Sequence, residues 1–185
     1  MKAGDWVAAA SGVLALCGVV LVVVIGWNRG LSPIAIVSAF DVEEAAYIHQ
    51  TGDGAVEGHI FVRLWSGQEV PCTGKPVLLV PQTTLSRERM AHLYGTAQEA
   101  GLRRHVRNPV KLEAPDPKYW DYMRQTPCEG AGSFRFAGVS DGDYFVVGSV
   151  SWKETNGWVA VTLMQPIQVR GGKQVHVVLT PRSET

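Results

Sequence analysis

The sequence predicts a mainly β protein, an antiparallel β-sandwich with a partly helical insert, preceded by one transmembrane helix. Near its N-terminus lies a long apolar run without charged side chains. Between residues 55 and 181, short segments of alternating hydrophobicity are separated by turn signals. These strands do not alternate regularly with helices, as a parallel sheet would require. The chain has 17 basic and 17 acidic residues, so its net charge gives no reason to expect a nucleic-acid partner.

The first predicted element is a membrane anchor, residues 1–29. Residues 6–28 carry no ionisable side chain except the thiol of Cys17. About 20 such residues span a hydrocarbon core of about 30 Å. Trp6 and Trp27 stand at the two ends, where indole rings favour the headgroup region. A cleaved signal peptide, a lipoprotein signal at Cys17 and a buried helix remain open alternatives to a retained signal-anchor.

Residues 30–54 are expected to form a juxtamembrane linker. Pro33 argues against a continuous helix, and the apolar run 34–37 is either a tether or an extra strand. The sequence Thr-Gly-Asp-Gly at 51–54 is a turn signal.

Domain 55–181 is expected to contain the sandwich, with residues 182–185 as a tail. In residues 56–65, apolar and polar side chains alternate, which is typical of a half-buried strand. Further strands are expected at 77–80, 133–136, 144–152, 158–164 and 174–179, with 165–169 as a continuation or a sixth strand. Gly171 and Gly172 predict a tight hairpin turn before the last strand.

An insert, residues 84–131, interrupts this pattern. Residues 86–102 predict a helix that Ser86 can cap and that Gly101 can end. Its apolar face would consist of Met90, Leu93, Tyr94 and Ala97.

Cys72 and Cys128 flank the insert, and a disulfide between them is favoured. It would contribute about 4 kcal/mol and require an oxidising compartment. Buried free thiols or metal ligation remain alternatives, although neither cysteine lies in a CxxC pattern. A disulfide would put the sandwich in the periplasm and the N-terminus in the cytoplasm. The expectation is therefore a single-pass protein of a bacterial inner membrane, with residues 6–28 in the lipid bilayer.

Several segments resemble a bacterial carboxypeptidase regulatory-like domain, a transthyretin-like (prealbumin-like) β-sandwich. The segments are Val-Glu-Gly-His-Ile-Phe-Val at 56–62, Cys-Thr-Gly at 72–74, Gly-Ser-Phe-Arg-Phe-Ala-Gly-Val at 132–139 and Gly-Asp-Tyr at 142–144. The resemblance covers about residues 55–181, apart from the insert. It implies an accessory or binding module rather than a peptidase.

The Gly-Asp-Tyr segment is expected to set the fold. Gly142 allows a sharp reversal, and Asp143 is expected to hydrogen-bond the turn backbone. Tyr144 is expected to bury its ring and to bond a loop carbonyl through its hydroxyl group.

The sequence gives little evidence for catalysis. SxxK and HExxH are absent, and the five histidines have no metal-site spacing. His59 and His176 fall within predicted strands, where a two-histidine site across strands is a disfavoured alternative. No catalytic residue, metal or cofactor is therefore expected, and the protein is not expected to be an enzyme.

Two clusters in the insert are candidate binding sites. Arg103, Arg104 and Arg107 could contact headgroups, an acidic glycan or an acidic partner, or form a solvated surface. Tyr119, Trp120 and Tyr122 would form a binding platform if exposed and core if packed.

Together these features predict a membrane-anchored, non-enzymatic module of the cell envelope. It would mediate interaction with another envelope protein or with its own copies. The alternative is a carbohydrate- or cell-wall-binding module that uses the aromatic residues of the insert.

Overall fold

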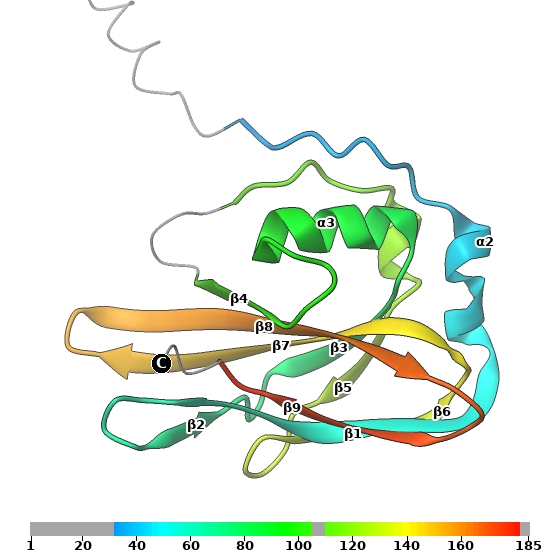
Figure 1. The fold of residues 1–185 in the computed structure, drawn as a ribbon. Helices are drawn as coiled ribbons and strands as arrows, with labels where there is room; N and C mark the ends of the chain where they lie inside the picture. Colours follow the sequence, from blue (N-terminus) through cyan, green and yellow to red (C-terminus); the bar gives the residue numbers. More distant parts are fainter. Residues whose placement is uncertain (1–31, 105–109, 182–185) are drawn as a thin grey trace, which may run out of the picture. The chain divides into compact units, whose positions relative to one another are not determined.

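The computed structural model describes residues 32–104 and 110–181, which form two β-sheets with helices over one of them (Figure 1). The compact unit begins at Ile34. The predicted anchor at 6–28, Arg107 and the tail at 182–185 lie outside the described residues. Within residues 32–104 and 110–181, no helix has the length and hydrophobicity needed to cross a membrane.

The four-stranded sheet is built around β1 (Thr51–Arg63). On one side β1 pairs antiparallel with β6 (Ser133–Val139) and, near its end, with β2 (Glu69–Pro71). On the other side it pairs in parallel with β9 (Gln174–Leu179). The predicted antiparallel arrangement is therefore wrong for this one pair.

The five-stranded sheet is antiparallel throughout. Its long central strands, β7 (Gly142–Glu154) and β8 (Gly157–Val169), form one continuous hairpin. The predicted segments 158–164 and 165–169 are thus one strand. The order across the sheet is β4 (Gly101–Arg104), β8, β7, β3 (Pro76–Pro81) and β5 (Arg124–Pro127).

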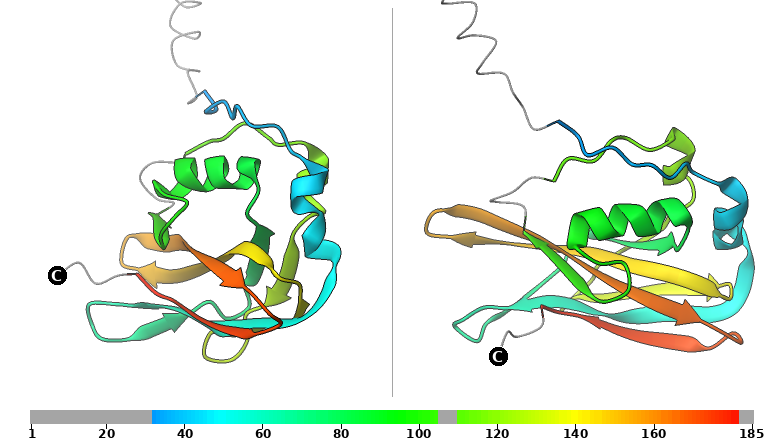
Figure 2. Two further views of the ribbon diagram at one scale, coloured as in Figure 1. Left: turned by 45° about the vertical axis from the view of Figure 1, so that its right-hand side comes forward. Right: turned by 45° about the horizontal axis from the view of Figure 1, so that its top comes forward.

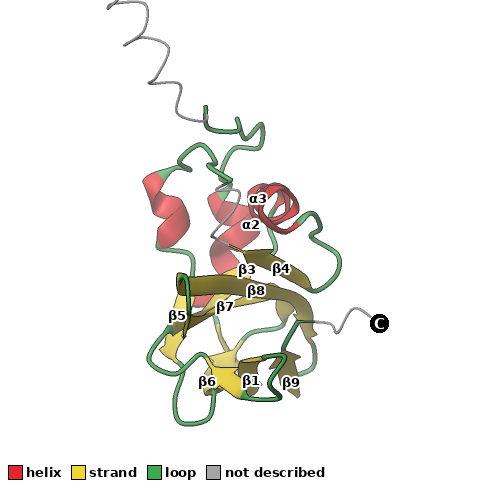
Figure 3. Ribbon diagram, turned by 90° about the vertical axis from the view of Figure 1, so that its left-hand side faces the viewer, coloured by secondary structure: helices red, strands yellow, loops and turns green. Residues whose placement is uncertain are grey.

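The inner faces of the two sheets enclose the main core (Figure 2). Ile60 of β1 packs directly over Gly148 of β7, where even a methyl group would collide with the isoleucine side chain. The five-stranded sheet is also covered on its other side: helices lie over its outer face (Figure 3). There Met90 of α3 packs with Phe145 and Met164. Burial on both faces explains the nearly continuous apolar sequence of β7.

The helix of the insert is shorter than predicted. α3 spans Thr84–Tyr94, with Thr83 rather than Ser86 as its N-cap and Gly95 (φ 77°) rather than Gly101 at its end. The serine completes a capping box with Thr83. Residues 101 and 102, predicted as the end of the helix, instead begin β4, so the insert supplies both outer strands of the five-stranded sheet.

Most of the predicted linker belongs to the compact unit. It contains α2 (Val42–Ala45), the 3-10 helix η1 (Ala46–His49) and the start of β1, where a turn was expected. Ile34 bridges Leu112, and Glu88 of α3 accepts the N–H groups of Val37 and Ser38 at 2.8 Å each.

The Gly171-Gly172 turn does not close a hairpin between paired strands, as was predicted. Both glycines have positive φ (61° and 65°), a conformation that favours glycine. The turn instead carries the chain from β8 in one sheet to β9 in the other.

Candidate functional site

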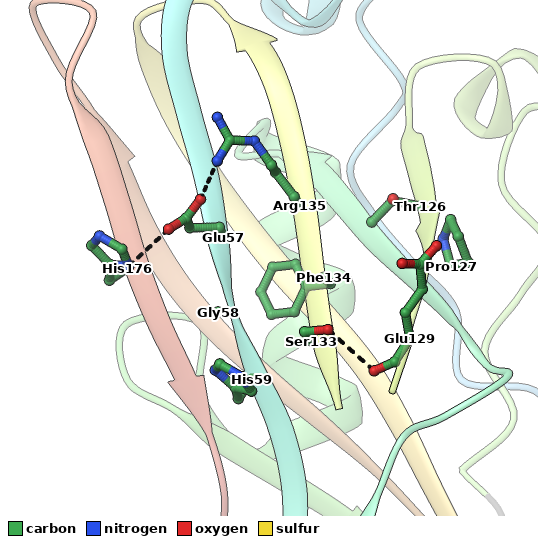
Figure 4. Close-up of a pocket in the computed structure, with 10 residues that line it drawn as sticks. All are labelled: Glu57, Gly58, His59, Thr126, Pro127, Glu129, Ser133, Phe134, Arg135 and His176. Carbon is green, nitrogen blue, oxygen red and sulfur yellow. Dashed lines mark hydrogen bonds and ion pairs between the residues drawn. The ribbon is translucent and has the colours of Figure 1, made fainter. Parts of the chain in front are cut away.

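A groove of about 520 Å³ lies along the outer face of the four-stranded sheet, beside the end of β5 (Figure 4). We call it the outer-face groove. Its floor comes from β1, β6 and β9, and it is lined by Glu57, Gly58, His59, Thr126, Pro127, Glu129, Ser133, Phe134, Arg135 and His176.

Strand register brings three polar side chains together in this groove. Glu57 of β1 lies opposite Arg135 of β6 and opposite His176 of β9. Residues that are paired across neighbouring strands point to the same side of a sheet. The side chain of Glu57 is only 23 % exposed, whereas those of Arg135 and His176 are 60 % and 70 % exposed. The carboxylate thus lies between a cation and an imidazole.

Direct contacts hold this arrangement in place. Arg135 donates from Nη1 to Oε2 of Glu57 at 2.5 Å. Nδ1 of His176 lies 3.3 Å from Oε1 of the same carboxylate. Figure 4 shows Glu57 between its two partners, with His59 further along β1. The exposed edges of the guanidinium and imidazole groups remain accessible to a ligand.

Gly58 explains how β9 can lie so close to β1. A Cβ atom at this position would overlap the backbone carbonyl of Val177 on β9. Only glycine therefore permits this approach, which brings His176 within reach of Glu57. The backbone of Gly58 lines the groove between Glu57 and His59.

The arrangement suits polar recognition more than metal binding. Among residues 32–104 and 110–181, no group of three His, Cys, Asp or Glu side chains could hold a metal ion. Carboxylate, guanidinium and imidazole groups on an open sheet face offer fixed acceptors and donors. Such a surface can match the alternating donors and acceptors of a hydroxyl-rich ligand.

The predicted disulfide between Cys72 and Cys128 is confirmed. The Cα atoms lie 5.8 Å apart, and both cysteines are buried in the main core. The bond joins the segment before β3 to the segment after β5, so it closes the base of the insert.

In the Gly-Asp-Tyr turn, the structure differs from the role expected for Asp143. The hydroxyl group of Tyr144 donates to the carbonyl of Ser140 at 2.9 Å, and the ring is fully buried. Asp143 does not hold the turn backbone; its carboxylate accepts from Arg170 at 2.5 Å. Asp141 holds the backbone instead, accepting from the N–H groups of Gly171 and Gly172 at 2.7 and 3.1 Å. These bonds lower the pKa of Asp141.

The three aromatic residues of the insert do not form a common platform. Tyr119, in the 3-10 helix η2 (Pro117–Trp120), is buried against Phe40, and burial raises its pKa to about 12. Tyr122 is half-buried and packs against the main core. Trp120 alone of the three is substantially exposed, at 55 %.

The described arginines of the basic cluster, Arg103 and Arg104, do not share one role. Arg103 donates from Nη2 to the carbonyl of Val110 at 2.8 Å, so it holds the insert together. Arg104 is exposed, and Arg107 lies outside the described residues.

The expectation of no catalytic residue treated the Gly-x-Ser-x-Gly nucleophile signature as absent, which is wrong, because residues 138–142 have this pattern. The structure assigns it a structural role. Ser140 is buried, and its hydroxyl group donates to the carbonyl of Tyr47 at 2.6 Å and contacts the hydroxyl of Tyr144 at 2.9 Å. The pattern joins two strands, β6 and β7, and not a strand and a helix as in a nucleophile elbow.

Sequence reasoning noted His59 and His176 but could not identify the face on which they lie. Strand alternation alone puts Glu57 and His59 on one side of β1, opposite the apolar Val56 and Ile60. The parallel pairing with β9, which adds His176, has no local sequence signal.

No family model matches the chain, and neither does any curated protein. The carboxypeptidase regulatory-like resemblance is therefore not supported by a family match. Among solved structures, the chain is similar to a candidate carbohydrate-binding protein from Pseudomonas aeruginosa, with a TM-score of 0.65 and 22 % sequence identity. The similarity covers 78 % of this chain and 99 % of that one, and it shows that the two share a fold.

Proposed function

We propose that this chain is a non-enzymatic module that binds carbohydrate in the outer-face groove. The observation that carries the proposal is the position of Glu57, held between Arg135 and His176 on an accessible sheet face. A carboxylate beside a guanidinium presents an acceptor and a donor to neighbouring sugar hydroxyl groups. Three paired strands hold these groups in position, so little side-chain order would be lost on binding.

The fold is consistent with this function, because it is shared with a candidate carbohydrate-binding protein. The site differs from the aromatic platform expected from sequence, since Tyr119 is buried. The groove replaces that platform as the proposed glycan site.

An oligosaccharide array probed with the full chain in mild detergent tests the proposal. Arg135→Ala should abolish the binding of any saccharide that the wild type retains. Arg63→Ala is the matched control, since Arg63 makes a similar exposed ion pair, with Glu69, elsewhere on β1. Absence of saccharide binding by the wild type, or equal loss in both variants, would refute the proposal.

We further propose that the module is anchored by residues 6–28 and lies on the periplasmic side of a bacterial inner membrane. The Cys72–Cys128 disulfide supports this location because such bonds persist in oxidising compartments. Reporter fusions at the C-terminus test it: a fusion active only in the cytoplasm would contradict it.

Protein interaction within the envelope is the second candidate function. Two exposed tryptophans favour it, Trp65 after β1 and Trp158 in β8. The β1–β2 and β7–β8 hairpins lie at the same end of the sandwich (Figures 1 and 2). Tryptophan is enriched at protein interfaces. A pull-down from mild detergent should recover a partner that the Trp65→Ala, Trp158→Ala double variant loses; recovery of the same proteins by both would exclude this surface.

A further inference from the structure

A second, smaller cavity of about 290 Å³ lies next to the outer-face groove. We call it the β5 pocket. Thr126 and Pro127, at the end of β5, line both cavities, so a single strand end separates the pocket from the groove. Figure 4 shows these two residues on the side of the groove away from β9. The β5 pocket is lined by Gly74, Lys75, Pro76, Gln125, Thr126 and Pro127.

The pairing of β5 with β3 shows how the side chains of this strand end are distributed. Thr126 lies opposite Val77, whose side chain is buried in the main core between the two sheets. Gln125 and Pro127 alternate with Thr126, so they point to the other face of the strand, on the same side as Pro76. A ligand that continues from the groove into the pocket therefore passes over the end of β5.

The two chain segments that line the β5 pocket are fixed to each other. The disulfide between Cys72 and Cys128 joins them. Gly74 donates its N–H group to the carbonyl of Cys128, and Cys128 donates to the carbonyl of Lys75, both at 2.9 Å. The groove and the pocket thus border the same cross-linked frame. Little order would be lost if one ligand occupied both.

The β5 pocket has polar groups that are free to contact a ligand. Lys75 and Gln125 are exposed, and their side chains have no hydrogen-bond or ion-pair partner among residues 32–104 and 110–181. An ammonium group donates, and an amide both donates and accepts, so together they can match neighbouring sugar hydroxyl groups. Pro76 and Pro127 lie opposite each other and add an apolar surface for the C–H groups of a sugar ring. A few polar groups beside an apolar surface are usual in small-molecule sites.

We propose that the ligand is an extended saccharide chain, with some sugar units in the outer-face groove and the following units in the β5 pocket. This inference rests on the proposed function, because it extends the same ligand beyond the same groove. It names the substrate class: the protein binds oligosaccharides or polysaccharides along their length, in preference to short saccharides that occupy the groove alone.

Calorimetry with saccharides of different length tests the extension. The probes are the disaccharide and the hexasaccharide of one repeating sugar, chosen from those that the full wild-type chain retains on the array in mild detergent. The hexasaccharide should bind at least about 20-fold more tightly than the disaccharide. This gain exceeds the few-fold effect of having several equivalent binding positions along a longer chain.

The double variant Lys75→Ala, Gln125→Ala should separate the two cavities. Its affinity for the hexasaccharide should fall about 10-fold, while its affinity for the disaccharide stays at the wild-type value because the groove is intact. Gln68→Ala, Lys153→Ala is the matched control. It removes an exposed glutamine and an exposed lysine that line neither cavity, so it should bind both probes as the wild type does.

Equal affinity of the wild type for the two probes, or unchanged hexasaccharide affinity in the Lys75→Ala, Gln125→Ala variant, would overturn the extension and leave the outer-face groove as the site. An equal loss for both probes would also overturn it, since the two residues would then act through the fold and not through additional sugar units. Arg135→Ala should instead abolish the binding of both probes. Absence of binding by the wild type would refute the proposed function itself.

Discussion

The guanidinium group of Arg135 lies 2.5 Å from the carboxylate of Glu57, directly across the β1–β6 pair. The arginine is 60 % exposed, and exposed ion pairs contribute little to folding stability. The pair is thus poorly explained as a stabilising contact. Because the pair lies in the outer-face groove, substituting one of its residues should change ligand affinity more than folding stability.

Glu57→Gln should separate the two properties. The change preserves shape but removes the charge that Arg135 and His176 contact. Saccharide affinity should fall about 10-fold or more by calorimetry, while stability in urea changes by less than about 1 kcal/mol. Glu69→Gln, which removes the acidic partner of Arg63, is the control and should leave affinity unchanged. Unaltered affinity in Glu57→Gln would exclude the carboxylate as a ligand contact.

Removing the disulfide should strongly destabilise the domain. The bond joins residues 56 positions apart, and closing such a loop restricts the unfolded chain. Replacing both cysteines by serine should lower the free energy of unfolding by about 4 kcal/mol in urea titrations. Reduction of the wild type should have a similar effect. A loss below about 1 kcal/mol in both experiments would show that the insert does not need this bond.

Tyr144→Phe tests the turn between β6 and β7. The variant leaves the buried Ser140 without its hydroxyl partner. The expected cost is about 1–3 kcal/mol in thermal or urea unfolding. Tyr122→Phe is the control, since the contacts of Tyr122 are ring contacts with Phe40 and His49. Equal effects of the two substitutions would argue against this role for the Tyr144 hydroxyl group.

Asp141 should contribute to the acid dependence of stability. Hydrogen bonds from Gly171 and then Gly172 lower its pKa below 3.8 in the folded state. A lowered folded pKa stabilises the protein above the unfolded value, and this stabilisation is lost as pH falls through the folded value. The stability difference between wild type and Asp141→Asn should therefore be larger at about pH 6 than at about pH 3. A constant difference across this range would disprove the linkage.

The sequence by itself determined the β class and most strands, and it favoured the disulfide over free thiols. Each depends on local information: alternation in residues 56–65, glycines at turns, and two cysteines flanking one insert. The end of the helix was predicted at Gly101, but Gly95 already ends α3. Gly101 instead begins β4, which extends the five-stranded sheet. The β propensity of a segment does not show whether it forms the outer strand of a sheet.

Only the tertiary structure decided where function could lie. Tyr119, Trp120 and Tyr122 are neighbours in sequence, yet packing against Phe40 buries one and leaves another exposed. Glu57, Arg135 and His176 are far apart in sequence, yet strand register brings them together. Register between distant strands depends on how whole sheets bury their apolar faces, so a local pattern cannot specify it.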